Sequence, residues 1–291
     1  NVVARAGADR PRRRIVLTAH IDATRAGRIF SRSFAERIAP YLRPRGDRPP
    51  ALGPFALPER LLWAAAIVAA ASALGAEGWL FGLARLGVGA LLAFGVFAML
   101  EWALAPYTPG ANDNASGVAA MLTCAEQLLA RLPSDAELWV VGTGAEEVGY
   151  CGMRALLDAH PDWRADQTCF VNFECVGGGA LHWVHSEGTL ARVTYPPTLT
   201  ELARRLAQGG AFGDVNPVHL MAGTDGCIPA ERQLHTLSLV ALEADGIPRN
   251  YHRVEDLAEA LDMECVIRAA DFAVAVSVAW LRGEADPLAI V

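Results

Sequence analysis

Two adjacent carboxylates, Glu146 and Glu147, stand in a glycine-rich turn after a short apolar run, Leu138–Val141. The run predicts a buried strand and residues 154–160 predict a helix. Both acids then lie at the carboxyl end of a strand, where open α/β sheets bind ligands. Adjacent carboxylates repel each other unless a cation joins them. One can hold a metal ion while the other faces the substrate; the alternative is a solvated acidic pair.

A histidine and an aspartate two residues apart follow a second predicted strand, Ile15–Ala19. On an extended segment His20 and Asp22 point to the same side. The carboxylate can then accept the second N–H of an imidazole that holds a metal ion. The alternative is a polar strand end with a local hydrogen bond.

Three further side chains of metal-ligand type stand at the ends of predicted elements. Asp113 precedes a helix predicted at about residues 115–132, where it could equally be an N-cap. Glu174 follows the apolar strand 168–173 and stands just before a run of three glycines. His252 stands upstream of a final helix predicted at about residues 257–281, and it could be an ordinary loop residue. Because predicted strands and helices alternate, we expect an α/β protein whose mostly parallel sheet gathers these strand ends on one edge.

His20, Asp113, Glu147, Glu174 and His252 then supply five ligands, and the neighbouring glutamate of the acidic pair is spare. Carboxylates mixed with imidazole suit zinc or a similar divalent ion. Five ligands and a free acid are what a two-metal hydrolase needs. One carboxylate bridges the ions, a water between them has a lowered pKa, and the free glutamate takes the proton of that water and hands it to the leaving amine.

Six blocks follow one another along the chain: Leu17-Thr-Ala-His-Ile-Asp22, Asn112-Asp-Asn-Ala-Ser-Gly117, Glu146-Glu-Val-Gly-Tyr-Cys-Gly152, Asn172-Phe-Glu-Cys-Val-Gly177, Thr224-Asp225 and Tyr251-His-Arg-Val-Glu-Asp256. In this order they resemble the M28-type zinc aminopeptidases, and together they cover most of residues 1–22 and 107–291. The resemblance implies a three-layer α/β/α sandwich on a mixed, mostly parallel sheet. It also implies two divalent metal ions, with Zn²⁺ as the expected metal, and a peptide substrate.

The same resemblance assigns a place to each ligand. It implies that Asp113 bridges the two ions, that His20 and Glu174 complete one site, and that Glu147 and His252 complete the other. These five assignments come from the resemblance and not from the spacing of the residues.

The resemblance further implies that Glu146 is the general base and that Asp22 orients His20 from behind. Two features depart from the family. Glu174 stands where the family commonly has Asp, and the connection from Asp22 to Asp113 is far longer than usual. The longer arm of the glutamate is expected to alter the spacing of the metal ions.

The predicted function is a metal-dependent exopeptidase, most simply an aminopeptidase that hydrolyses N-terminal peptide bonds. Two alternatives stay open: a glutaminyl-cyclase-like acyltransferase, which shares the fold, and a non-catalytic binding domain of the same fold. Retention of His20 together with Glu146 and Glu147 favours the two-metal hydrolase. Because carboxypeptidase-type relatives exist, the end of the peptide that is attacked is itself an expectation.

A stretch inside the long connection is apolar over nearly its whole length. Leu61–Leu74 and Trp79–Leu100 are joined by the turn Gly75–Gly78, and Arg85 is the single charge in the second segment. Each segment is at or a little under the ~20 residues that span a bilayer. Helices of this kind are apolar on all faces, which predicts insertion in a membrane; buried or dimer-forming helices are the alternative.

We therefore predict a metallopeptidase domain formed by 1–54 and 107–291, with a hydrophobic helical hairpin inserted at 55–106. Membrane association is expected through 61–105. Basic residues prefer the cytoplasmic side of a membrane, so the catalytic domain is expected to face the cytoplasm. The residues that carry this orientation are Arg43, Arg45, Arg48 and Arg60.

Composition bounds the remaining possibilities. The 291 residues carry a formal net charge of −7, which disfavours a nucleic-acid partner. The six cysteines are scattered without a CxxC pair, so zinc-ribbon and thioredoxin-type motifs are absent from the sequence. The chain begins with Asn1 on what resembles an interior strand, residues 1–4, and we therefore expect N-terminal sequence to be missing.

Overall fold

The computed structural model describes residues 1–31, 56–188, 191–208 and 210–284. The chain forms two compact units. The first unit comprises Asn1–Thr24 and Thr108–Val291, and the second unit comprises Arg25–Tyr107. The domain boundary predicted between residues 54 and 55 lies outside the described residues.

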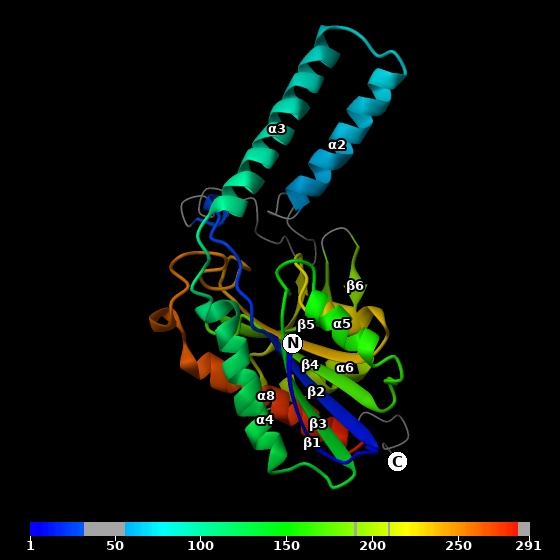
Figure 1. Ribbon diagram of the computed structural model, residues 1–291, viewed down its shortest axis with the longest axis vertical. Coiled ribbons are helices and arrows are strands. Elements are labelled where there is room, and N and C mark those ends of the chain that lie inside the picture. Colours follow the sequence, from blue (N-terminus) through cyan, green and yellow to red (C-terminus); the bar gives the residue numbers. More distant parts are fainter. Residues whose placement is uncertain (32–55, 189–190, 209, 285–291) are drawn as a thin grey trace. The chain divides into compact units, whose positions relative to one another are not determined.

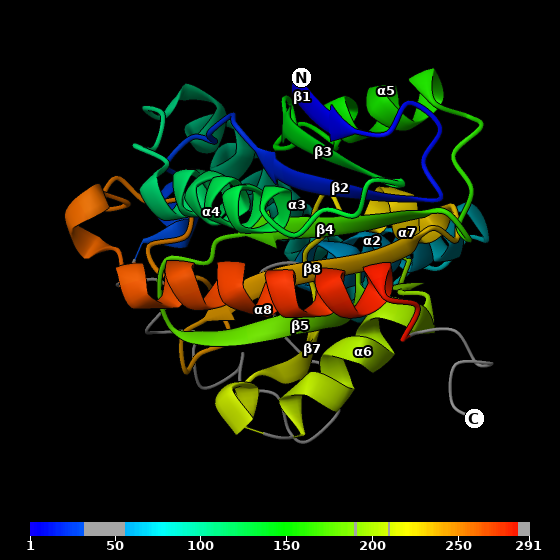
Figure 2. The ribbon, with the colours of Figure 1, turned by 90° about the horizontal axis from the view of Figure 1, so that it is seen from below.

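The first unit is built on an eight-stranded sheet in the order β1-β3-β2-β4-β8-β5-β6, with β7 paired to β5. The central strands β2, β3, β4 and β8 run parallel. Strand β1 pairs antiparallel with β3, and β5 pairs antiparallel with β8 and β6 but parallel with β7. Figure 2 lets the reader follow the strands from β1 at the top to β7 at the bottom. The strands are β1 Val2–Gly7, β2 Arg13–His20, β3 Ala136–Thr143, β4 Thr168–Glu174, β5 Ala180–Glu187, β6 Val193–Thr194, β7 Asn216–Leu220 and β8 His235–Leu242.

Helices cover both faces of this sheet (Figure 2). On one face, residues of α4, α6 and α8 pack with Leu17, Val171 and Leu237 in the larger core. On the other face, residues of α5 and α7 pack with Val16 and Phe170. The predicted α/β fold on a mixed, largely parallel sheet flanked by helices is confirmed. The helices are α4 Gly117–Leu129, α5 Cys151–Ala159, α6 Pro197–Ala207, α7 Cys227–Glu231 and α8 Met263–Leu281.

Two sequence predictions about this unit were wrong in detail. The first strand is not interior: β1 lies at the edge of the described sheet, where it pairs with β3, and is exposed along its length. The final helix begins at Met263 and not near residue 257. Asp262 is its N-cap, because the carboxylate accepts the backbone N–H groups of Glu264 (3.0 Å) and Cys265 (3.4 Å).

The second unit contains two long helices, α2 Ala56–Ala73 and α3 Trp79–Leu104, that run antiparallel as a hairpin (Figure 1). Its base is held within the unit: the indole N–H of Trp102 donates to the carbonyl of Arg25 at 2.6 Å, and the Arg25 guanidinium donates to the carbonyl of Ala105 at 2.7 Å. Among the described residues, α3 is the one helix long and apolar enough to cross a membrane.

The two chain ends of the first unit that flank this insertion meet each other. The backbone N–H of Thr108 donates to the carbonyl of Thr24 at 2.9 Å, and the Thr108 hydroxyl donates to the same oxygen at 3.2 Å. The first unit is therefore closed at the point where the chain leaves and re-enters it.

Candidate metal centre

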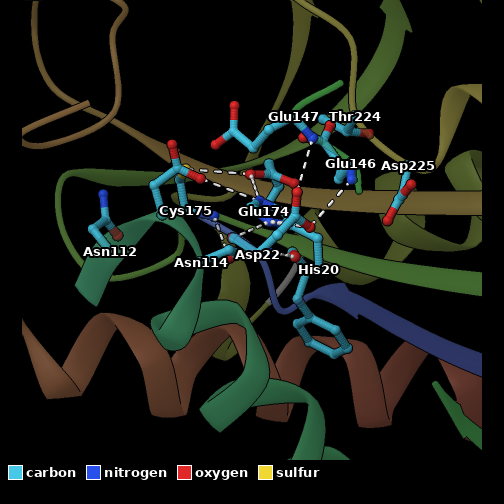
Figure 3. A network of polar contacts seen from close by, with 12 residues as sticks. His20, Asp22, Asn112, Asn114, Glu146, Glu147, Glu174, Cys175, Thr224 and Asp225 are labelled. Atoms are coloured by element: carbon cyan, nitrogen blue, oxygen red, sulfur yellow. Dashed lines mark hydrogen bonds and ion pairs between the residues drawn. The ribbon is translucent and has the colours of Figure 1, made fainter. Parts of the chain in front are cut away.

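The parallel register of the central strands brings the predicted site residues to one edge of the sheet. His20 ends β2 opposite Thr143, the last residue of β3, and the Glu146–Glu147 turn follows β3 directly. Thr18 of β2 pairs with Asn172 of β4, so Glu174 lies level with His20. Figure 3 shows these side chains converging from the ends of three strands.

Asp113 reaches the same edge from the turn Ala111–Ser116 that precedes α4, and two amide side chains hold that turn against the end of β4. The Asn114 carbonyl oxygen accepts the backbone N–H of Cys175 at 3.0 Å. The Asn112 carbonyl oxygen accepts the backbone N–H of Gly177 at 2.7 Å. The sequence folds in this way locally because short amide side chains can replace the backbone hydrogen bonds that a turn leaves unmade.

The carboxylate of Asp113 lies between two pairs of ligand-type groups. Its Oδ1 is 3.1 Å from His20 Nε2, and that nitrogen is 3.2 Å from Glu174 Oε1. Its Oδ2 is 3.3 Å from His252 Nε2, and that nitrogen is 3.6 Å from Glu147 Oε2. The structure thus brings together all five predicted ligands, with one carboxylate shared by two imidazole–carboxylate pairs.

The tautomer of His20 follows from its contacts. Nδ1 lies 3.0 Å from the backbone carbonyl of Asp22, which can only accept, so Nδ1 carries a proton. Nε2 is left facing the carboxylates of Asp113 and Glu174. Burial alone lowers the pKa of His20, but the charge of Glu174 and the hydrogen bond to Asp113 outweigh it and raise the pKa well above its ordinary value.

The predicted role of the Asp22 side chain in orienting His20 stays a prediction. Its nearest carboxylate oxygen lies 3.8 Å from His20 Nδ1, within ion-pair range, while the hydrogen bond of Nδ1 goes to the Asp22 backbone carbonyl. The Asp22 carboxylate binds a different part of the site, because it accepts the backbone N–H of Glu146 at 3.1 Å and that of Glu147 at 3.3 Å (Figure 3). Asp22 therefore fixes the turn that presents the two glutamates.

A second aspartate, Asp256, fixes the turn that carries Asp113. The carboxylate of Asp256 accepts the backbone N–H groups of Asn112 (2.7 Å) and Asp113 (3.1 Å). Sequence reasoning gave Asp256 no role, although it stands at the end of one of the family-like blocks. Buried Asp225, which accepts a hydrogen bond from the Thr143 hydroxyl, was likewise missed as a site neighbour.

Negative charge dominates the cluster. Burial and the neighbouring charge of Glu174 raise the pKa of Glu146 to about 10, and burial with the charge of Asp113 raises the pKa of Glu147 to about 8. Burial opposes ionisation of Asp113 also, but hydrogen bonds from His20 and His252 hold its pKa well below the ordinary range. Cations bound among these groups would lower the pKa values of Glu146 and Glu147 again.

The donor set fits divalent metal ions. Oε1 of Glu147 and Oε2 of Glu174 are buried and accept no hydrogen bond from the described residues. Ligand atoms of His20, Asp113 and Glu147 lie within 4.8 Å of one another, as do those of Asp113, Glu174 and Cys175. Carboxylate oxygen with imidazole nitrogen is the donor chemistry of zinc and similar ions.

Comparison with known proteins defines the class to which this fold and site belong. Residues 95–277 match the model of Peptidase family M28, and the chain belongs to this family. Aminopeptidase YwaD of Bacillus subtilis (strain 168) is 27% identical over 205 residues, which are 67% of this chain and 43% of that protein. The chain therefore spans less than half the length of this curated relative.

Solved structures show the same fold at low identity. BSAP, a zinc aminopeptidase from Bacillus subtilis, superposes with a TM-score of 0.55 at 17% identity, over 94% of this chain and 48% of that chain. LapB from Legionella pneumophila gives 0.57 at 14% identity, over 95% and 54%. The glutaminyl cyclase of Porphyromonas gingivalis gives 0.54 at 13% identity, over 94% and 75%.

Proposed function

We propose that the chain is a metal-dependent aminopeptidase that hydrolyses the N-terminal peptide bond of its substrate. The observation that carries the proposal is the position of Asp113, whose two oxygens each face a separate imidazole–carboxylate pair. One carboxylate shared in this way suits two ions held side by side. Membership of a peptidase family and the similarity to Aminopeptidase YwaD support the same interpretation.

Five side chains would hold the metal ions, which we propose to be zinc as in the similar aminopeptidase of Bacillus subtilis. His20 and Glu174 complete one site, Glu147 and His252 complete the other, and Asp113 contributes to both. When bound, the ions supply Lewis-acid charge and lower the pKa of a water at the site. The hydrogen bond from His20 Nδ1 to the Asp22 carbonyl keeps Nε2 aimed at the metal position.

Glu146 is the proposed general base. It stands next to a ligand but outside both imidazole–carboxylate pairs, in a turn that the Asp22 carboxylate fixes from behind. The Glu146 carboxylate takes a proton from the attacking water and passes it to the amine that leaves when the peptide bond breaks. Burial keeps bulk water away from this carboxylate, so the proton stays at the site during the transfer.

A glutaminyl-cyclase-like acyltransferase is the second candidate, because a cyclase shares the fold at a TM-score of 0.54. In that reaction the α-amine of an N-terminal glutamine attacks its own side-chain amide, and ammonia leaves. His20 facing Asp113 and Glu174, with both Glu146 and Glu147 present, favours two-metal hydrolysis over this reaction.

A substrate screen with parallel metal analysis tests the proposal. Aminoacyl p-nitroanilides and short peptides should be hydrolysed in the presence of zinc, N-acetylated versions of the same substrates should not, and the protein should bind two ions per chain. Ammonia release from glutaminyl peptides without hydrolysis would assign the cyclase reaction instead. Cleavage of N-blocked peptides from the carboxyl end would assign a carboxypeptidase.

A further inference from the structure

The hairpin formed by α2, α3 and the turn Leu74–Gly78 contributes no residue to the metal centre, and its surface is unlike that of a water-soluble helix pair. No described residue of either helix is buried. We propose that this hairpin spans a lipid bilayer, with the turn on one side and both ends of the hairpin on the other. The inference is independent of the proposed peptidase chemistry.

Apolar side chains surround α3 on every side. Leu83, Leu91, Leu92 and Leu100 are between 37% and 57% exposed, and at about 100° per residue they point in four different directions. An amphipathic helix would keep its polar residues on the face opposite such a stripe. Between Leu80 and Leu100 the helix has no polar face to turn toward water.

The few polar groups in the apolar stretches are compatible with lipid. Ser72 is the one hydroxyl between Leu61 and Leu74, and it donates to the Val68 carbonyl at 2.9 Å, so it needs no water. Arg85 lies six residues into α3, about 9 Å from the helix start at ~1.5 Å per residue. A long arginine side chain can reach the interface from that depth.

The length of α3 and the ends of the hairpin also match a bilayer, whereas the apolar part of α2, Arg60–Ala73, is shorter than a full span. Leu80–Leu100 would extend about 31 Å at ~1.5 Å per residue, close to the ~30 Å of a hydrocarbon core. Trp63 and Trp79 are 65% and 74% exposed. Exposed indoles are favoured at the boundary between lipid and water, where one part of the ring is apolar and the N–H stays wet.

A bilayer fits this surface better than a second copy of the chain. Pairing two hairpins in water would bury one face of each helix and leave the opposite apolar faces exposed, since the apolar residues run all round α3. A bilayer covers all faces at once and requires only that backbone groups be paired within the helices. It also places the Glu77 carboxylate of the turn in water on the far side.

The distribution of charge orients the hairpin. Arg25, Arg28 and Arg60 lie at its base, whereas Arg85 is the one basic residue near the turn end and Glu77 is the one charged residue of the turn itself. Because basic residues near spanning helices favour the cytoplasmic side, the base, and with it the first unit, faces the cytoplasm in this proposal.

Flotation with phosphatidylcholine vesicles tests insertion in the full chain. The wild type should float with the vesicles and resist extraction by high salt and by carbonate. Leu86→Asp combined with Leu91→Asp should lower the floating fraction at least about tenfold, because acids at the centre of a spanning helix strongly disfavour insertion. A matched control combines Leu122→Asp with Leu129→Asp, two leucines of the first unit that are 55% and 50% exposed.

The outcomes distinguish a bilayer from a second copy of the chain as the partner of the hairpin surface. Flotation of the wild type and the control, but not of the α3 variant, supports the bilayer. A wild type that stays in solution without detergent as a defined oligomer, or an α3 variant that floats as well as the wild type, overturns it. Circular dichroism and thermal unfolding, recorded on every variant, show that each one is folded without reference to the proposed enzyme function.

A single cysteine in the turn tests whether the hairpin crosses the bilayer. Of the six native cysteines, Cys151 is exposed and the others are buried. In a Cys151→Ser background, Ala76→Cys should react with a membrane-impermeant thiol reagent added to intact cells that produce the protein. Reaction only after the cells are opened places the turn on the cytoplasmic side and overturns the orientation. Failure to react in either case places it within the lipid and overturns the span.

Discussion

The metal centre and the hairpin violate the usual distribution of side chains in opposite ways. The first gathers buried carboxylates, with Asp113, Glu146 and Glu174 all under 10% exposed, while the second exposes apolar side chains along a whole helix. Buried charge requires opposite charge, and exposed apolar surface requires apolar cover. Each region thus indicates its own missing partner by chemistry, a pair of cations for one and lipid for the other.

The supporting structure of the two regions differs as well. Around the metal centre, Asp22 and Asp256 each bind two backbone N–H groups, so the turns that carry ligands are fixed before any ligand arrives. The hairpin has hydrogen bonds at its base and within its helices, but its outer surface makes no comparable contacts among the described residues. Preorganisation suits a site that must hold ions at set positions. Insertion in a fluid bilayer requires only an apolar segment of sufficient length.

Removal of Asp113 should have the largest effect on the metal centre. Asp113→Ala takes away the carboxylate shared by both imidazole–carboxylate pairs, so both metal sites should empty. Activity should fall by more than the ~10²–10⁴-fold expected for loss of a general base. Elemental analysis and the hydrolysis assay measure the two effects. Asp162→Ala, an exposed acid, is the control; an active Asp113→Ala protein that keeps two ions would make Asp113 a helix cap.

A narrower change separates the chemistry from the metal. Glu146→Gln keeps the shape of the side chain but cannot take a proton, so turnover should fall by roughly 10²–10⁴ while both ions stay bound. Glu147→Gln is the matched comparison one residue away, and it should lose metal from one site. If metal is lost from the Glu146 variant and retained in the Glu147 variant, the two glutamates have exchanged roles.

Much of the site could be predicted because its ligands stand at element ends that the sequence marks. Parallel strands align their carboxyl ends, so His20 and Glu174 were expected on one edge, and the register of β2 with β4 places them level. The order of the family-like blocks supplied the two ligands that come from helix starts and loops. The functional roles of these residues stay predictions until metal binding and activity are measured.

The supporting contacts could not be predicted in the same way. Asp256 binds backbone groups 143 and 144 positions away, and nothing local distinguishes it from the exposed acids of the same stretch. The apolar pattern of β1 indicated a strand but not its place at the edge, since a strand's neighbours are set by the whole sheet. The start of α8 could have been predicted from the sequence, because Asp262 is a residue type that caps helices.

A buried acid outside the set of metal ligands should give a smaller, pH-dependent effect. Tyr195 and Thr224 donate to one oxygen of Glu187, at 2.7 Å and 3.3 Å, and burial raises the pKa of Glu187 to about 8. Between about pH 4.5 and pH 8 the unfolded chain releases this proton while the folded chain keeps it. The unfolded state then binds fewer protons, so this group lowers stability as pH rises through that interval.

Glu187→Gln isolates the effect, because glutamine does not titrate. The Tm of the variant minus that of the wild type should increase from pH 5 to pH 8, by roughly 5 °C. Thermal unfolding at constant metal concentration measures the difference, and subtraction removes the titration of the metal-site carboxylates, which both proteins share. A difference that does not change with pH would mean that Glu187 is ionised in the folded protein despite its burial.

The smallest effect on catalysis should come from the largest change, removal of the second unit. Thr24 and Thr108 are already hydrogen-bonded to each other at 2.9 Å, so a short Gly-Ser linker can replace Arg25–Tyr107 without moving either end. The loop-closure cost changes only by ~0.6 kcal/mol per doubling of length. We expect kcat/KM on a short peptide to stay within about twofold, because a change in loop length alters the closure entropy and thus the stability of the first unit, and leaves the residues of the metal centre in place. A rise in KM of about tenfold or more would show that Arg25–Tyr107 contributes to the substrate site. The metal centre and the hairpin would then act together in binding substrate and would not be functionally separate.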